Sequence, residues 1–185
     1  RENFIKRCVG IAGDSIQIIN GKLYVNGKPG EEFPQAQRYY LLQVPDGDYL
    51  DKEKLHNFGI DVREEQNDFG QIKNNLYQLN ITNAEKAKLS LPKGYILTDF
   101  YMDHQNDLFP YYNDSTGRTW SGDNYGPLWI PKKGASIPLT HDNLIRYQRC
   151  IQVYEGNTFE ERNGKYFING TEATSYTFKM DYYWL

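Results

Sequence analysis

The sequence of 185 residues lacks any long apolar run. A helix that crosses a bilayer needs about 20 consecutive apolar residues, and a secretory signal needs a basic start followed by an apolar stretch. Neither pattern occurs in the sequence. We therefore interpret the chain as a soluble globular one that is long enough to bury a sizeable core.

An excess of basic residues is also missing. The chain has 21 Lys and Arg against 24 Asp and Glu, a net charge of -3, and the two signs are interspersed. A surface that neutralises a phosphate backbone needs clustered positive charge. Nucleic acid is therefore not an expected partner.

Cysteine is scarce, with Cys8 and Cys150 as its two copies. A small disulfide scaffold would carry more of them at dense spacing. Two alternatives remain open, a single Cys8–Cys150 bond in an oxidising compartment or two free thiols.

Aromatic residues are abundant in the sequence. They make up 15% of the chain, 16 of them Tyr, while the mean hydropathy is -0.75. Aromatic residues are enriched in strands and apolar helical faces are few here, so the composition favours a mainly β fold.

Two hairpins are predicted near the two ends of the chain. Residues 15–19 and 22–25 alternate as strands around Asn20-Gly21, a pair typical of a two-residue turn with positive φ. The segment NGKLYVNG at 20–27 returns as NGKYFING at 163–170, and an Arg-Cys pair precedes each, at Arg7-Cys8 and Arg149-Cys150. Either the chain contains one duplicated β unit or the common Asn-Gly turn arose independently in both places.

The middle of the chain differs in character from these ends. Short helices are predicted at 51–58 and at 82–89, the second with the capping-box pattern of Thr82 and Glu85, and a third begins at Thr140. We expect a β core formed by residues 1–28 and 139–185, with residues 29–138 as an inserted, largely β subdomain.

The strand predicted at 3–9 carries the residue of greatest chemical interest. Alternation places Phe4, Lys6 and Cys8 on one face, so the lysine has apolar neighbours along its own face. A lysine that is buried without a partner favours the neutral amine, which is what a general base requires. The alternative is an edge-strand lysine that extends into water.

The run FIKRCVGIAGDSI at 4–16, followed by GKLYVNG at 21–27, resembles the lysine box of bacterial type I signal peptidases, which are Ser-Lys proteases. Ala12 stands where that family usually has proline. The segments YGPLWIPKKG at 125–134 and YTFKMDYYW at 176–184 are similar to the long-insert signal peptidases of didermal bacteria. The resemblance implies a coiled β-sheet or partly open barrel as the catalytic core.

The resemblance also assigns roles to individual residues. It implies that Lys6 is the general base, that Arg7 supports the site, and that Gly13 and Asp14 form a structural turn. Asn3, Phe4 and Ile5 would line the groove that receives the substrate. No metal or organic cofactor is implied.

The nucleophile of this family lies in a Ser-Met-x-Pro segment before the lysine strand, and a Gly-Asp-Asn-Arg box follows a strand like 178–185. We expect both segments to lie outside these 185 residues, so that the chain alone is inactive. Ser15 and the run Ser121–Asn124 imitate the two boxes, but the residues that follow them differ, and we interpret both as structural.

The expected whole protein is a membrane-anchored endopeptidase that removes signal peptides from exported preproteins on the periplasmic side of the bacterial cytoplasmic membrane, through an anchor outside this chain. The alternative is a noncatalytic periplasmic or secreted β-rich binding module whose insert is a ligand surface. A serine-lysine self-cleaving repressor ranks third.

Two further patterns have plainer interpretations. Asp99, Asp103, His104 and Asp107 could bind a metal only if their loop folded to bring them together, and we favour a solvated acidic loop. The aromatic residues between 101 and 129 are expected to pack inside the insert rather than to form a binding platform.

Overall fold

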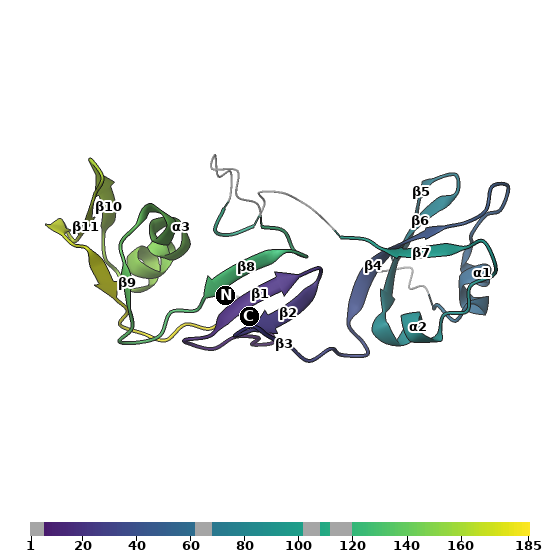
Figure 1. Cartoon of the computed structure of the whole chain (residues 1–185), viewed down its shortest axis with the longest axis horizontal. Coiled ribbons are helices and arrows are strands. Elements are labelled where there is room, and N and C mark those ends of the chain that lie inside the picture. Colours follow the sequence, from purple (N-terminus) through teal and green to yellow (C-terminus); the bar gives the residue numbers. More distant parts are fainter. Residues whose placement is uncertain (1–5, 62–67, 102–107, 112–119) are drawn as a thin grey trace, which may run out of the picture. The chain divides into compact units, whose positions relative to one another are not determined.

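The computed structural model describes residues 6–61, 68–101, 108–111 and 120–185. These residues are mainly β-strand with three short α-helices, so the predicted mainly β class is confirmed. The chain divides into two compact units, one of residues 31–102 and the other of residues 1–30 together with 103–185 (Figure 1). No sheet of the described residues closes into a barrel.

The first sheet of the larger unit contains the N-terminal hairpin, and its strand order is β3-β2-β1-β8. These strands are β1 (Ser15–Ile19), β2 (Lys22–Val25), β3 (Lys28–Pro29) and β8 (Tyr125–Trp129). Asn20 and Gly21 take φ of 50° and 71°, as the predicted turn requires, and Ile19 then pairs with Lys22. Because β8 adds to the other edge of β1, the hairpin is joined to residues more than a hundred positions away.

The C-terminal hairpin reproduces the first one in detail. Strands β10 (Phe159–Arg162), β11 (Lys165–Ile168) and β12 (Thr171–Glu172) form a three-stranded sheet. The Asn26 side chain accepts from the Ser15 N–H at 2.9 Å, and the Asn169 side chain accepts from the Thr158 N–H at the same distance. The asparagines of the four Asn-Gly turns, two in each repeat, all have φ between 50° and 53°. The sequence repeat is therefore also a structural repeat, down to its side-chain hydrogen bonds.

The remaining elements of this unit pack around one core. They are β9 (Ser136–Pro138), β13 (Ser175–Thr177), α3 (His141–Arg149) and the π-helix η2 (Cys150–Tyr154). Thr140 begins α3 as predicted, with its hydroxyl accepting from the Asn143 N–H at 3.2 Å. Ile151 and Phe178 are almost fully buried in the core, where Phe178 contacts Trp129 and Tyr147 edge-on or tilted.

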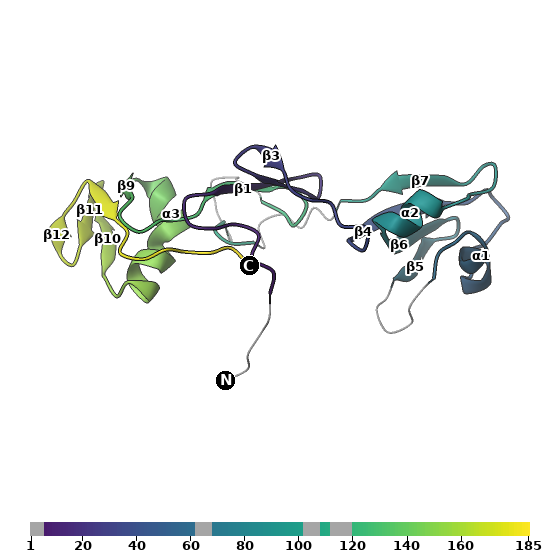
Figure 2. The same cartoon turned by 90° about the horizontal axis from the view of Figure 1, so that it is seen from below.

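The unit of residues 31–102 has its own sheet and its own core. The sheet order is β5-β6-β4-β7, with β4 (Gln37–Gln43), β5 (Phe69–Lys73), β6 (Leu76–Thr82) and β7 (Ile96–Asp99). Every second residue of β6 is buried, namely Tyr77, Leu79 and Ile81, which is the alternation of a sheet covered on one face. Helices α1 (Lys52–Asn57) and α2 (Asn83–Lys88) lie beside this sheet (Figure 2).

Both helices of this unit begin where the sequence indicates. The Asp51 side chain caps α1 by accepting from the Lys54 N–H at 2.8 Å. At α2 the capping box is complete, since Thr82 accepts from the Glu85 N–H and Glu85 accepts from the Thr82 N–H. These caps satisfy backbone donors that the first turn leaves without partners.

The compact units divide the chain at a different place from the expected insert of residues 29–138. Residues 103–185 are in one unit with the N-terminal hairpin, to which they are joined by the pairing of β8 with β1. Their strand partners are distant in sequence, so composition along the chain does not reveal this boundary.

The strand expected at 3–9 is not formed in its described part. Residues 6–9 have no strand assignment, and Gly10 makes one isolated bridge with Trp184. A β-strand needs a partner strand along its length. Among the described residues of this segment, Gly10 alone pairs with another strand-like residue, through its bridge to Trp184.

Candidate active site

The lysine predicted as general base lies at an exposed position. Lys6, Arg7 and Cys8 are all exposed, while Asn3, Phe4 and Ile5 lie outside the described residues. The Cys8 thiol donates to the Gly10 carbonyl at 3.3 Å. The expected shielding of Lys6 by strand neighbours is not seen among the described residues, because this segment is not part of a sheet there.

The chain becomes anchored directly after this segment. The Val9 N–H donates to the Trp184 carbonyl at 2.9 Å, and the Trp184 N–H donates to the Gly10 carbonyl at 2.9 Å. Gly10 itself is buried. Two segments from opposite ends of the chain are thus joined four residues after Lys6.

The turn formed by Gly13 and Asp14 is tied to its neighbours on several sides. Gly13 has φ of 95°, in the left-handed region that favours glycine. The Asp14 carboxylate accepts from the Ile11 N–H at 3.0 Å and from the Asn26 side chain at 2.7 Å, and these bonds lower the pKa of Asp14. The Ile130 N–H donates to the Asp14 carbonyl at 2.7 Å, and the Gly13 N–H donates to the Ile130 carbonyl at 2.8 Å. This turn therefore links the lysine segment, the hairpin and the end of β8.

The serines that imitate the family's boxes lie in ordinary structural positions. Ser15 begins β1. Ser121 is buried, and its hydroxyl accepts from the Asn124 N–H at 3.0 Å, which is a turn contact. In the described ranges no serine hydroxyl is hydrogen-bonded to a lysine amine.

A cavity of about 470 Å³ lies in the same unit, lined in part by Trp129, Tyr147, Cys150, Tyr182 and Trp184. Burial raises the pKa of Tyr147 to about 12 and that of Cys150 to about 11. The Cys150 thiol is therefore a poor nucleophile at neutral pH. Because Trp184 belongs both to the cavity wall and to the bridge with Gly10, the cavity lies next to the anchor of the lysine segment.

A carboxylate organises the chain beside this cavity. Glu155 accepts from the Tyr176 hydroxyl at 2.5 Å, from the Tyr182 hydroxyl at 3.1 Å and from the Lys179 N–H at 3.0 Å. Burial is the main cause that raises the pKa of both tyrosines, and Glu155 adds to it, after Cys150 in the case of Tyr182, so these hydroxyls stay protonated. The arrangement holds the segment that leads to Trp184 against η2.

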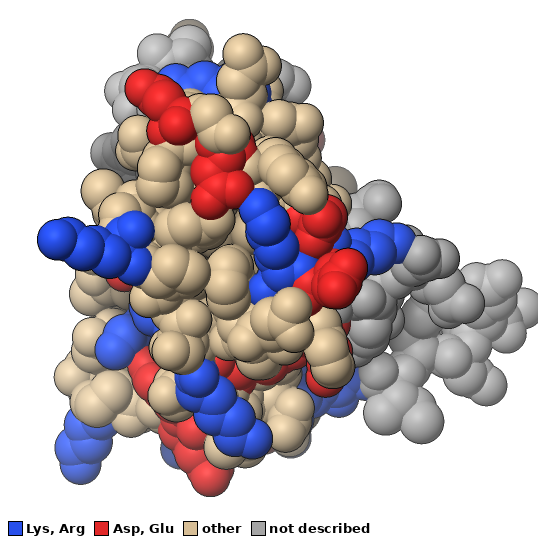
Figure 3. Space-filling model, turned by 90° about the vertical axis from the view of Figure 1, so that its right-hand side faces the viewer, with Lys and Arg blue, Asp and Glu red and all other residues tan. Residues whose placement is uncertain are grey.

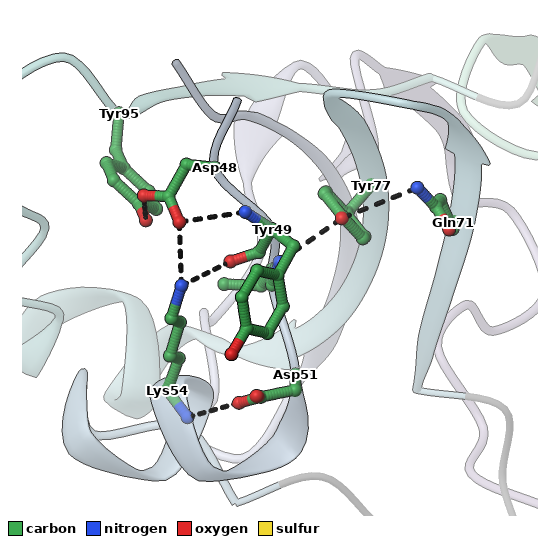
Figure 4. A network of polar contacts seen from close by, with 8 residues as sticks. Asp48, Tyr49, Asp51, Lys54, Gln71, Tyr77 and Tyr95 are labelled. Carbon is green, nitrogen blue, oxygen red and sulfur yellow. Dashed lines mark hydrogen bonds and ion pairs between the residues drawn. The ribbon is translucent and has the colours of Figure 1, made fainter. Parts of the chain in front are cut away.

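The unit of residues 31–102 has its own polar cluster (Figure 4). The Asp48 carboxylate accepts from the Lys54 amine at 2.7 Å, from the Tyr49 N–H at 2.8 Å and from the Tyr95 hydroxyl. The hydrogen bonds from Lys54 and Tyr95 lower the pKa of Asp48 to about 2. The Lys54 amine also lies 3.8 Å from the centre of the Tyr49 ring. Since the Asp48 carboxylate, the Lys54 amine and the Tyr95 hydroxyl already bond neighbours, we interpret the cluster as an anchor for α1.

Of the four residues weighed as a metal site, the structure describes Asp99. Asp99 pairs with Lys86 at 2.9 Å, whereas Asp103, His104 and Asp107 lie outside the described residues. Within the described ranges no three metal-binding side chains converge, and no helix has the length and apolarity to cross a membrane. Figure 3 shows positive and negative side chains interspersed over the face in view.

Sequence reasoning missed Gly10 and Trp184 as part of this site. A glycine inside an apolar strand-like run is a signal of close backbone approach, so Gly10 could have been found. Nothing local to Trp184 indicates its partner, because the contact joins residues 174 positions apart.

Comparison with known proteins gives two matches. Residues 1–98 match the family described as signal peptidase, peptidase S26. A protein of Synechocystis sp. (strain ATCC 27184 / PCC 6803 / Kazusa), named probable signal peptidase I-2, is 43% identical over 51 residues, which cover 25% of this chain and 23% of that protein. The match thus spans about a quarter of the curated relative. No solved structure matches the chain significantly.

Proposed function

The chain belongs to the signal peptidase family, peptidase S26, and we propose that it forms part of a serine endopeptidase that cleaves N-terminal signal peptides from exported preproteins. One observation carries the proposal. The family match over residues 1–98 includes the segment with Lys6, the turn at Gly13 and Asp14, and the first hairpin.

In the proposed mechanism Lys6 is the general base and the serine comes from outside the 185 residues. The serine oxygen attacks the scissile carbonyl while the neutral amine of Lys6 takes the hydroxyl proton, and the protonated amine then supplies a proton to the leaving amino group. Water hydrolyses the resulting ester with Lys6 again as base. Arg7 supports the site, and Asn3, Phe4 and Ile5 line the groove.

The exposed position of Lys6 in this chain gives the proposal a specific requirement. An amine in water stays protonated at neutral pH, so a lysine base needs a cover that excludes water. We propose that the segment with the serine and the bound signal peptide together form this cover. The 185 residues alone are then inactive, because they have a base without a nucleophile or an oxyanion site.

The proposed setting follows from the same family membership. The substrate is a preprotein that emerges on the periplasmic side of the bacterial cytoplasmic membrane, and the enzyme is held there by an anchor outside this chain. Neither a metal nor an organic cofactor takes part in the proposed chemistry.

The test uses the full-length protein and a preprotein with a cleavable signal peptide. Lys6→Ala is expected to lower kcat by roughly 10³-fold or more, since loss of a residue that activates the nucleophile has effects of this size. Lys28→Ala, which removes an exposed lysine of β3, serves as the matched control and is expected to cleave normally.

Two results would count against the proposal. Cleavage at an unchanged rate by the Lys6→Ala protein would show that this amine is not the base. Binding of the preprotein without cleavage by the unaltered full-length protein would favour a noncatalytic β-rich module instead.

A further inference from the structure

The backbone at Gly10 lies in a space too small for a side chain. A Cβ atom built there would lie 2.4 Å from the Cδ1 of Ile130 and 2.8 Å from the Cγ2 of Ile16, with the Trp184 Cβ at 3.7 Å. Carbon atoms in contact stay about 3.5 to 4.0 Å apart, so both isoleucines would have to move. The φ of Gly10 is not in the left-handed region, and packing alone therefore excludes a larger residue.

The two isoleucines have little freedom to move away. Ile16 is 1% exposed and lies on β1 between its partners Val25 and Leu128. Ile130 is 3% exposed, and both its N–H and its carbonyl bond the Gly13-Asp14 turn. An added methyl group would therefore displace the Gly10 backbone more readily than the core beneath it.

The structural repeat provides an internal comparison. In the second copy Arg149-Cys150 corresponds to Arg7-Cys8, and Gln148 stands at the position of Lys6. The second copy has one more residue before its turn, so either Gln152 or Val153 corresponds to Gly10. There the chain forms the π-helix η2, whereas residues 6–9 of the first copy lie in neither a helix nor a strand. The copy that has no glycine at this position thus also has no lysine at the position of Lys6, and its chain is helical there.

We propose that Gly10 is a positioning residue for the general base, because it lets the lysine segment lie directly against Ile16 and Ile130 and bond Trp184. The inference rests on the proposed role of Lys6. The two hydrogen bonds at Val9 and Gly10 set where the chain leaves the sheet, and Lys6 lies four residues before that point. A shift of the Gly10 backbone is passed on to the amine through this short segment.

The test is Gly10→Ala in the full-length enzyme. A catalytic group displaced by about 1 Å costs on the order of 10²-fold in rate, so kcat is expected to fall by roughly 10- to 100-fold with little change in KM. Gly122→Ala is the matched control, since a Cβ there meets nothing within 4 Å. Ile130→Val removes the Cδ1 atom, which is the nearer of the two clashing groups, and combined with Gly10→Ala it is expected to restore part of the lost rate while the contact with Ile16 remains.

A second variant tests the same anchor without a change at Gly10. Trp184→Pro removes the N–H that donates to the Gly10 carbonyl, whereas Trp184→Phe keeps it. The phenylalanine variant is expected to retain about ten-fold more activity than the proline variant. This pair keeps the proposal testable if Gly10→Ala does not fold.

The outcomes separate this inference from the proposed function. If Lys6→Ala is inactive but the folded Gly10→Ala enzyme is as active as Gly122→Ala, the positioning role is wrong and the base assignment stands. If Lys6→Ala cleaves normally, the proposed function fails, and the positioning role fails with it.

Discussion

Leu79→Ala is predicted to destabilise the unit of residues 31–102 while leaving the other unit intact. Leu79 is fully buried on β6, where it pairs with Tyr40 of β4 and Phe69 of β5. Replacing a buried leucine by alanine removes its contacts and leaves a cavity, which costs about 2 to 5 kcal/mol. For a domain of this size each kcal/mol lowers Tm by roughly 4 to 8 °C.

The effect is expected to stay within one unit because the two cores share no residue. Tyr40, Leu55 and Leu79 belong to one buried cluster, and Ile16 and Phe178 belong to the other. All three tryptophans of the chain lie outside residues 31–102. Tryptophan fluorescence therefore reports on one unit alone, whereas far-UV circular dichroism reports on both.

The assay is urea unfolding of the chain, followed by both signals. Leu79→Ala is expected to shift the circular-dichroism transition of its own unit to lower urea and to leave the tryptophan transition in place. Ile72→Ala on β5, where the side chain is 52% exposed, is the matched control, with an expected change within about 0.5 kcal/mol. An equal shift of the tryptophan transition would refute the independence of the two cores.

Two further predictions concern titratable groups. Because burial raises the pKa of Cys150 to about 11, only about one in a thousand of its thiols is ionised at pH 8. Maleimide is therefore expected to label the exposed Cys8 first in a mass-spectrometric time course. Equal labelling rates of the two cysteines would contradict the burial of Cys150. The pKa of Asp48 is lowered to about 2, so its bonds to Lys54 and Tyr95 stabilise the fold above about pH 4 and are lost as the pH falls toward 2. Asp48→Asn is expected to flatten the acid side of the stability curve, measured by urea unfolding from pH 5 to 2, and an unchanged slope would argue against the pairing.

Local chemistry explains which parts of this fold could be predicted. The Asn20-Gly21 turn, the capping box of Thr82 and Glu85, and the cap at Thr140 all depend on residues within a few positions of one another. The structure reproduces each of them. The similarity between the two hairpins is visible in their amino-acid sequences, and it extends to the hydrogen bonds of Asn26 and Asn169.

The candidate site could be predicted only in part, for the same reason. The family resemblance predicts Lys6 and the turn at Gly13 and Asp14 as site residues from a continuous run of residues, and this assignment stays a prediction. The position of β8 beside β1, the bridge between Gly10 and Trp184, and the exposure of Lys6 depend on which distant segments meet. The sequence alone therefore determined the turns, the caps and the chemical character of the lysine segment. The tertiary structure decided what anchors that segment, because hydrogen bonds and packing between remote residues leave no periodic pattern in the chain.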